Sequence, residues 1–179
     1  MYQWGAQSSV IRDLFTYGRE QAAKIGDENV FDFSIGNPTV PAPECIKDAV
    51  TEIMETRTAV AVHGYTAAAG DPVVRKGLAD YMNKTFNAGV EAGNFYMTCG
   101  AAASLTITLK ALVESPDDEI VVIAPYFPEY TAFIKNSGAE KVVVPPDMES
   151  FQIPFDALEQ AITSKTRALI INSPNNPSG

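Results

Sequence analysis

A regular alternation of strand-like and helix-like segments in the second half of the chain constrains the fold most strongly. Short runs rich in Val and Ile predict strands, and segments with helical spacing lie between them. The predicted strands are 95–99, 119–125, 141–146 and 167–174, and the predicted helices are 101–114, 128–138 and 154–162. Continuous apolar strands that alternate with helices are typical of right-handed βαβ units. The sequence therefore predicts a three-layer α/β fold with helices on both faces of a mainly parallel sheet.

The first half of the chain is less regular. Apolar periodicity predicts helices over three segments, the second with Pro43 in its first turn and the third capped by Asp71. These segments are 9–25, 42–58 and 72–86. A short alternating strand is predicted at 30–35, and "AVHGYTAAAGDP" at 61–72 is predicted to be a loop.

The charge balance excludes some partners. Thirteen Lys and Arg against twenty-two Asp and Glu give a net charge of −9, which disfavours binding to nucleic acid or anionic membranes. A local basic pocket for a phosphorylated ligand is still compatible with it. The first residues show no secretory signal, and no run approaches the ~20 apolar residues that cross a bilayer. We expect a soluble, cytoplasmic protein in which Cys45 and Cys99 are reduced thiols, although a disulfide between them stays open.

The segment "MTCGAAASL" lies where a predicted strand runs into a helix. The first N–H groups of a helix have no intrahelical acceptor and lie at the positive end of its dipole, so they attract anions such as phosphate. Gly100, Ala101 and Ala102 would let an anion approach the backbone closely. The alternative is that small residues only permit tight packing of strand and helix. Neither a GxGxxG fingerprint nor a P-loop is present.

Two further motifs follow strands of the same sheet, and ligands of parallel sheets gather at the carboxyl ends of strands. In "APYFPEY", Tyr126 or Phe127 could stack on a planar heteroaromatic ligand, or one of them could simply cover the core. In "NSPNNPSG", the amides of Asn172, Asn175 and Asn176 could bind a ligand oxygen or N–H group. The Ser-Pro and Asn-Pro bonds there could be cis. Alternatively, the segment is an ordinary polar turn without a binding role.

Two loops of the first half also offer polar groups. "SIGNPTVP" exposes the backbone around Gly36, beside Asn37, and "HGYTAAAG" carries the hydroxyl of Tyr65. Each could be an ordinary turn. His63 is the only histidine of the chain, and we assign it no role because a lone loop histidine is more often structural or solvated than catalytic. No spacing suggests a metal site.

In this order along nearly the whole chain, the motifs resemble the first part of the class I/II aminotransferases, enzymes of fold type I that depend on pyridoxal 5'-phosphate (PLP). The resemblance implies that Gly36 lies beside the substrate carboxylate and that Tyr65 reaches the cofactor phosphate of the other subunit of a homodimer. It implies that Phe127 stacks on the pyridine ring, with Tyr126 as the second candidate. Asn176 would bind the phenolic oxygen of the cofactor, next to the substrate.

The resemblance also implies that the turn of Gly100, Ala101 and Ala102 holds the cofactor phosphate. Many relatives carry hydroxyl or amide side chains in this turn, whereas this chain has Cys99 before the glycine and Ala101 and Ala102 directly after it. We therefore expect backbone N–H groups to make most of the contacts with the phosphate.

The lysine that binds the cofactor as a Schiff base follows the N-N-P-S-G motif in this family, as do the acidic partner of the pyridinium nitrogen and the arginine for the substrate carboxylate. None of the eight lysines matches, and we reject Lys165 in "TSK" because it precedes its strand. The resemblance thus implies an amino-terminal fragment, inactive alone, with 1–45 belonging to the small domain and 46–179 to an incomplete large domain. Its uncovered sheet edge would favour self-association.

Four functional hypotheses remain. The parent protein is expected to be a PLP-dependent aminotransferase that moves an amino group between an amino acid, of aspartate or aromatic type, and a 2-oxo acid. A PLP-dependent carbon–sulfur lyase of the same fold is a first alternative. A non-catalytic module that binds a phosphorylated ligand is a second, and a nucleotide-binding domain is weaker because both phosphate-loop fingerprints are absent.

Overall fold

The structure is a computed structural model that describes residues 10–34, 36 and 40–179. The chain forms two compact units, Met1–Gly64 and Tyr65–Gly179, and each is described by itself. The assignment of 1–45 to a small domain and of 46–179 to a large one stays a prediction.

The described part of the first unit begins with a long amphipathic helix. The predicted helix is confirmed as α2 (Val10–Ile25), and Gly26, at a φ of 93°, directly follows it before the short turn η1 (Asp27–Asn29). The predicted strand at 30–35 is wrong for 30–34, which form no strand. No strand pairs with this segment in the described part of the unit, and the backbone N–H of Ser34 instead donates to Asp32 Oδ1 at 2.8 Å.

The second predicted helix of this unit is confirmed with shorter bounds. It is α3 (Glu44–Thr56), which begins after Pro43. The loop predicted from residue 61 is corrected at its start, because residues 61–63 belong to the short helix α4 (Ala59–His63). The Oγ1 atom of Thr58 accepts from the N–H of Ala61 at 3.3 Å and caps this helix.

The second unit begins with a helix whose bounds agree with the prediction, α5 (Pro72–Phe86). The Asp71 carboxylate accepts from the N–H groups of Val73 at 2.8 Å and Val74 at 3.2 Å. Arg75 of this helix donates through Nη2 and Nε to the Ala92 carbonyl, which holds the turn η2 (Ala92–Asn94) against α5.

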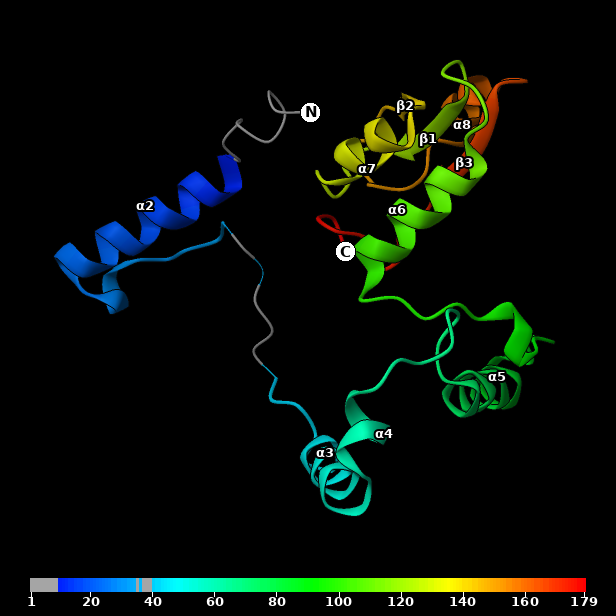
Figure 1. The fold of residues 1–179 in the computed structure, drawn as a ribbon. Coiled ribbons are helices and arrows are strands. Elements are labelled where there is room, and N and C mark those ends of the chain that lie inside the picture. The colour runs from blue at the N-terminus through cyan, green and yellow to red at the C-terminus, as the bar shows by residue number, and fades with distance from the viewer. Residues whose placement is uncertain (1–9, 35, 37–39) are drawn as a thin grey trace. The chain divides into compact units, whose positions relative to one another are not determined.

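The second unit contains a parallel sheet (Figure 1), as predicted. Its strands are β1 (Glu119–Ile123), β2 (Glu140–Val144) and β3 (Thr166–Ile170), in the order β2-β1-β3. Both pairings are parallel. The helices that alternate with them are α6 (Ala101–Leu112), α7 (Tyr130–Ser137) and α8 (Phe155–Ala161).

The predicted strand at 95–99 is wrong, because the structure forms no strand there. No strand of the described residues pairs with it, and Tyr96 is exposed. A single backbone bond, from the Met97 N–H to the Ala69 carbonyl at 3.0 Å, joins this segment to the preceding loop. Alternating apolar residues form a strand only where a neighbouring strand accepts their hydrogen bonds.

The core lies between the sheet and the helices α6 and α7. Leu109 of α6 and Ile134 of α7 pack against Ile120 and Val122 of β1, and both isoleucines are completely buried. Val121 points to the opposite face of the strand and is also completely buried. The central strand is therefore covered on both faces, which explains its continuous apolar sequence.

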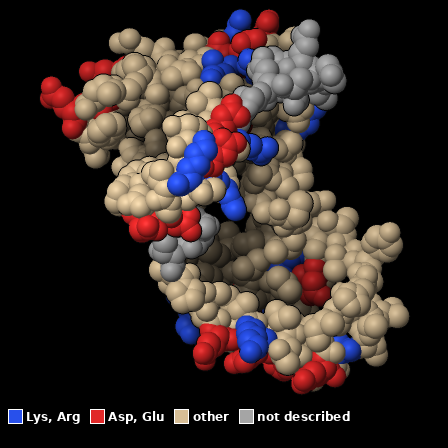
Figure 2. Space-filling view, turned by 90° about the vertical axis from the view of Figure 1, so that its left-hand side faces the viewer, with Lys and Arg blue, Asp and Glu red and all other residues tan. Residues whose placement is uncertain are grey.

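Charged side chains do not gather by sign on the face drawn in Figure 2, where acidic, basic and uncharged residues are interspersed. In the part of the chain that the structure describes, no helix is both long enough and apolar enough to span a bilayer.

Candidate functional site

Three sequence motifs converge on the carboxyl edge of the sheet. Helix α6 reaches the amino end of β1 through the short connection 113–118, so it runs against the strand direction and its first turn lies toward the carboxyl edge. Phe127 follows β1, and Asn176 follows β3, at that same edge. The topology therefore gathers the glycine turn, the aromatic pair and the asparagine loop as expected.

The turn before α6 is open above its backbone. Gly100 has a φ of 107°, a region that glycine adopts readily, and no heavy atom lies within 4 Å of the position where a Cβ would be. No side chain caps the helix, and Ala101 and Ala102 are exposed. The free N–H groups of this first turn, without side chains in the way, fit an anionic group such as a phosphate.

Two hydroxyl groups brace this turn. The Oγ1 of Thr98 and the Oγ of Ser104 are 2.6 Å apart, and Thr98 Oγ1 also donates to the Gly100 carbonyl at 3.1 Å. The same carbonyl accepts the Ser104 N–H at 3.1 Å. Sequence reasoning missed this pair, although the two hydroxyl residues that flank the glycine and alanine run were the available signal.

The two aromatic residues after β1 have different surroundings. Phe127 is half-buried, packs against the core cluster and meets the Tyr130 ring edge to face, with centroids 5.6 Å apart. The hydroxyl of Tyr126 accepts a hydrogen bond from Lys141. Tyr130 stacks on the Tyr126 ring, and the Lys141 Nζ lies 5.0 Å from the centre of that ring. Phe127, which the resemblance implied, stays the first candidate to stack on a ligand.

The loop after β3 is tied to the loop after β1. The Asn175 Nδ2 donates to the Pro125 carbonyl at 2.9 Å and to the Ser178 Oγ at 2.8 Å. Asn176 is exposed in the turn 176–178. The Ser173–Pro174 and Asn176–Pro177 bonds are both cis, the isomer that the sequence left open.

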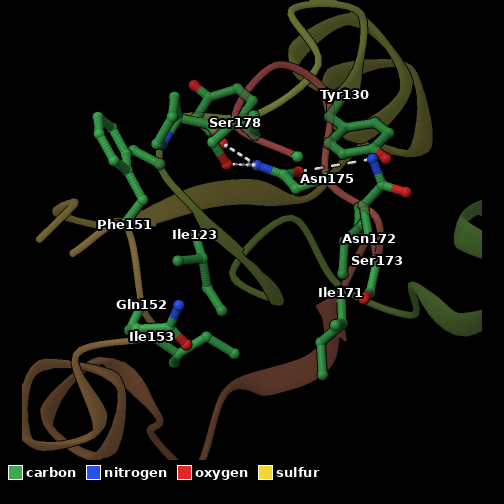
Figure 3. A pocket seen from close by; sticks show the side chains of 15 residues that line it. Ile123, Tyr130, Phe151, Gln152, Ile153, Ile171, Asn172, Ser173, Asn175 and Ser178 are labelled. Carbon is green, nitrogen blue, oxygen red and sulfur yellow. Dashed lines mark hydrogen bonds between the residues drawn. The ribbon is translucent and has the colours of Figure 1, made fainter.

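A pocket of about 290 Å³ lies between these loops. The ends of β1 and β3 line it, together with Tyr126, Tyr130 and the loop 151–153. Figure 3 shows Phe151 and Gln152 on one side of the pocket and Asn172 and Asn175 on the other. Sequence reasoning found the asparagines but missed the loop 151–153, which carries no recognisable motif.

Gly100, Phe127 and Asn176 do not line this pocket. Both polar and apolar residues line this cavity, and most of its polar groups belong to the asparagine loop after β3. Its edge position is where a ligand of a parallel sheet is expected.

Gly36 and Tyr65, the other two predicted site residues, are exposed. Gly36 belongs to the first unit and has no heavy atom within 4 Å of its Cβ position. Tyr65 begins the second unit with a fully exposed side chain. His63 ends α4, and Asn37 lies outside the described residues.

Neither a metal cluster nor a disulfide is found in the described residues. No group of three or more His, Cys, Asp or Glu side chains there could hold a metal ion. Cys45 and Cys99 are free and exposed.

Comparison with known proteins decides the family. The family model of class I and II aminotransferases matches residues 28–179. The chain belongs to this family. The resemblance inferred from the motifs is thereby confirmed, together with the α/β fold that it implied.

The relatives include aminotransferases of different named activities. The aspartate aminotransferase of Pyrococcus horikoshii is 32% identical over 172 residues, which are 96% of this chain and 41% of that protein. The asparagine–oxo-acid transaminase of Streptococcus mutans is 30% identical over 168 residues, 93% of this chain and 42% of the relative. The chain thus spans about two-fifths of the length of these curated relatives.

A solved structure agrees with the fold. The crystal structure of an aminotransferase from Eubacterium rectale superposes with a TM-score of 0.96 at 53% identity. The match covers 99% of this chain and 45% of that chain.

Proposed function

We propose that the full-length protein containing this chain is a PLP-dependent aminotransferase that transfers an amino group between an amino acid and a 2-oxo acid. The names of the relatives, which refer to aspartate and asparagine, favour an amino acid of the aspartate type over one of the aromatic type. The open, uncapped first turn of α6 at the carboxyl edge is the observation that carries the proposal within this chain.

The phosphate of the cofactor is assigned to the backbone N–H groups of Gly100, Ala101 and Ala102. The absence of a Cβ at Gly100 and the free space above it support this assignment, as does the favourable dipole of a helix that is 12 residues long. Hydrogen bonds to a charged acceptor are stronger than neutral ones, so a turn without polar side chains is sufficient to hold a phosphate.

The ring of the cofactor is assigned to Phe127 and Asn176. Phe127 would supply a stacking face, and its contact with Tyr130 holds that ring in one orientation. Asn176 is exposed at the end of the loop, where its amide would bind the phenolic oxygen of the cofactor and lie next to the substrate.

The cofactor, when bound, supplies an aldehyde that accepts the amino group and an aromatic ring that withdraws electrons from the bond being broken. This chain contributes groups that bind and orient it. The lysine amine that moves the proton, the acidic partner of the ring nitrogen and the arginine for the substrate carboxylate are assigned to the part of the relatives that this chain does not span.

Two exposed residues would complete the site from elsewhere. Gly36 would lie beside the substrate carboxylate, and Tyr65 would reach the cofactor phosphate of a second subunit. The complete exposure of Tyr65 supports a role outside its own unit. The protein would then be a homodimer of the cytoplasm with a role in amino acid metabolism.

The test is a pair of reactions with the purified full-length protein and PLP. With aspartate or tyrosine and a 2-oxo acid acceptor, the proposal predicts equal amounts of the new amino acid and the new 2-oxo acid. A carbon–sulfur lyase would instead convert a cysteine conjugate and water into a thiol, ammonia and pyruvate without an acceptor. Binding of PLP without either reaction would support the non-catalytic module and contradict the proposal.

A further inference from the structure

A lysine on β2 holds the first of three aromatic rings after β1. The Nζ of Lys141 donates to the Tyr126 hydroxyl and to the Thr131 Oγ1, the latter at 2.8 Å, and it lies 5.0 Å from the centre of the Tyr126 ring. In the described part of the chain, no ion pair includes Lys141. Its half-buried ammonium group is therefore directed at hydroxyl groups.

The held ring is connected to Phe127 through a second one. Tyr126 and Tyr130 are stacked with centroids 6.4 Å apart and an interplanar angle of 13°. Tyr130 then meets Phe127 edge to face, at 5.6 Å and 81°. Tyr130 is only 8% exposed and belongs to the core cluster. Because there is little free space around this ring, a displacement of Tyr126 would change the contacts of Tyr130.

The lowered pKa of Tyr126 agrees with its hydrogen bond to Lys141. Burial raises the pKa of this phenol, but the hydrogen bonds with Lys141 and Thr131 and the lysine charge outweigh burial, so the pKa lies below its ordinary value.

We propose that Lys141 is a positioning residue that sets the orientation of the Phe127 ring through Tyr126 and Tyr130, and thereby the stacking of that ring on the cofactor. The inference rests on the proposed function, because Phe127 is the assigned stacking residue. Aromatic pairs favour particular mutual orientations of their rings, so a ring held less firmly would stack on the cofactor less well although the contact itself remains.

The experiment uses the full-length protein and three variants. Lys141→Met removes the charge and the donors but keeps an unbranched side chain. Lys141→Arg restores a donor, and Lys84→Met is the matched control, since Lys84 is an exposed lysine at the end of α5. The measurements are the dissociation constant of PLP, the induced circular dichroism of the bound cofactor, and the thermal unfolding of the PLP-free protein.

Lys141→Met is expected to weaken PLP binding by about threefold to tenfold and to change the sign or size of the induced circular dichroism. Lys141→Arg should recover most of both, and Lys84→Met should change neither. Unchanged affinity and dichroism in Lys141→Met would overturn the inference. A lower unfolding temperature with unchanged dichroism would also overturn it, because that is the result of a purely structural lysine.

A fourth variant, Tyr126→Phe, keeps the ring and removes the acceptor, so it tests the inference even where Lys141→Met does not fold. Because Lys141 and Tyr126 act through one hydrogen bond, the double variant of Lys141→Met and Tyr126→Phe should bind PLP no more weakly than the single variant with the lower affinity. Additive losses would contradict the inference. If the unaltered protein does not bind PLP, the proposed function fails; if it binds PLP and Tyr126→Phe is indistinguishable from it, only this inference fails.

Discussion

The Asn175 side chain donates to the Pro125 carbonyl at 2.9 Å, across 50 residues of sequence. This bond joins the loop after β3, which carries Asn176, to the loop after β1, which carries Phe127. The two residues assigned to the cofactor ring are thus positioned by a neighbouring asparagine rather than only by their own contacts.

Asn175→Ala is expected to weaken PLP binding by about fivefold to tenfold, since a lost hydrogen bond of this kind contributes about 1 kcal/mol. Titration of the full-length variant with PLP measures the effect. Ser178→Ala is the control, because it removes the other acceptor of Asn175 at 2.8 Å and leaves the Pro125 bond. An effect of Ser178→Ala as large as that of Asn175→Ala would contradict this assignment.

A comparison of Gly100 with Gly77 separates the effect of backbone conformation on stability from the effect of steric crowding. A Cβ would meet nothing within 4 Å at either Gly100 or Gly77, but only Gly100 has a positive φ. Gly100→Ala is expected to destabilise the fold by about 1 kcal/mol and to weaken PLP binding. Gly77→Ala, inside α5, should stabilise the protein by about 0.5 to 1 kcal/mol. Denaturant unfolding of both variants measures this, and equal effects would contradict the account.

The carboxylate of Asp118 makes the stability of the protein depend on pH in the acid range. It is 4% exposed at the amino end of β1. Hydrogen bonds from the backbone N–H groups of Glu114 and Ser115, with the ion pair to Arg167 at 2.9 Å, outweigh burial and lower its pKa. A lowered folded pKa contributes stability that is present above the unfolded value of about 3.9 and is lost as the pH falls through the folded value.

The unfolding temperature of the full-length protein should therefore fall as the pH is lowered below about 4, and Asp118→Asn should flatten that part of the profile. Asp117→Asn is the control, since the neighbouring side chain is exposed. Superimposable profiles of Asp118→Asn and the unaltered protein would show that this carboxylate has no such role.

The cap of α5 gives a test independent of the cofactor. Asp71→Ala removes the acceptor of two backbone N–H groups and should destabilise the protein by about 1 kcal/mol. Asp71→Ser, which keeps a capping oxygen, should recover most of this loss in denaturant unfolding. Equal losses in the two variants would mean that the capping bond is not the cause.

The predictable parts of this fold depend on local chemistry. Asp71 and Pro72 mark the start of α5, and the Val-rich runs mark β1 and β2, because capping and burial on both faces act within a few residues. The segments 30–34 and 95–99 have strand-like sequences but no partner in the described residues. Strand formation depends on that partner, which the local pattern does not contain.

The site shows the same division. The positions of Phe127 and Asn176 at the carboxyl edge follow from motifs after strands. The bond between Lys141 and Tyr126 instead depends on the register in which Ile120 lies opposite Lys141. A shift of one residue would turn the lysine to the other face of the sheet. The contribution of the loop 151–153 to the pocket also depends on long-range packing, so the sequence pattern did not predict it.

The central claim is that the first turn of α6 holds the phosphate of PLP. The most direct measurement compares the affinity of the full-length protein for PLP and for pyridoxal, which lacks the phosphate. The account predicts that PLP binds more tightly by at least about 100-fold, because two or more charge-assisted hydrogen bonds are lost with the phosphate. Equal affinities for PLP and pyridoxal would contradict it.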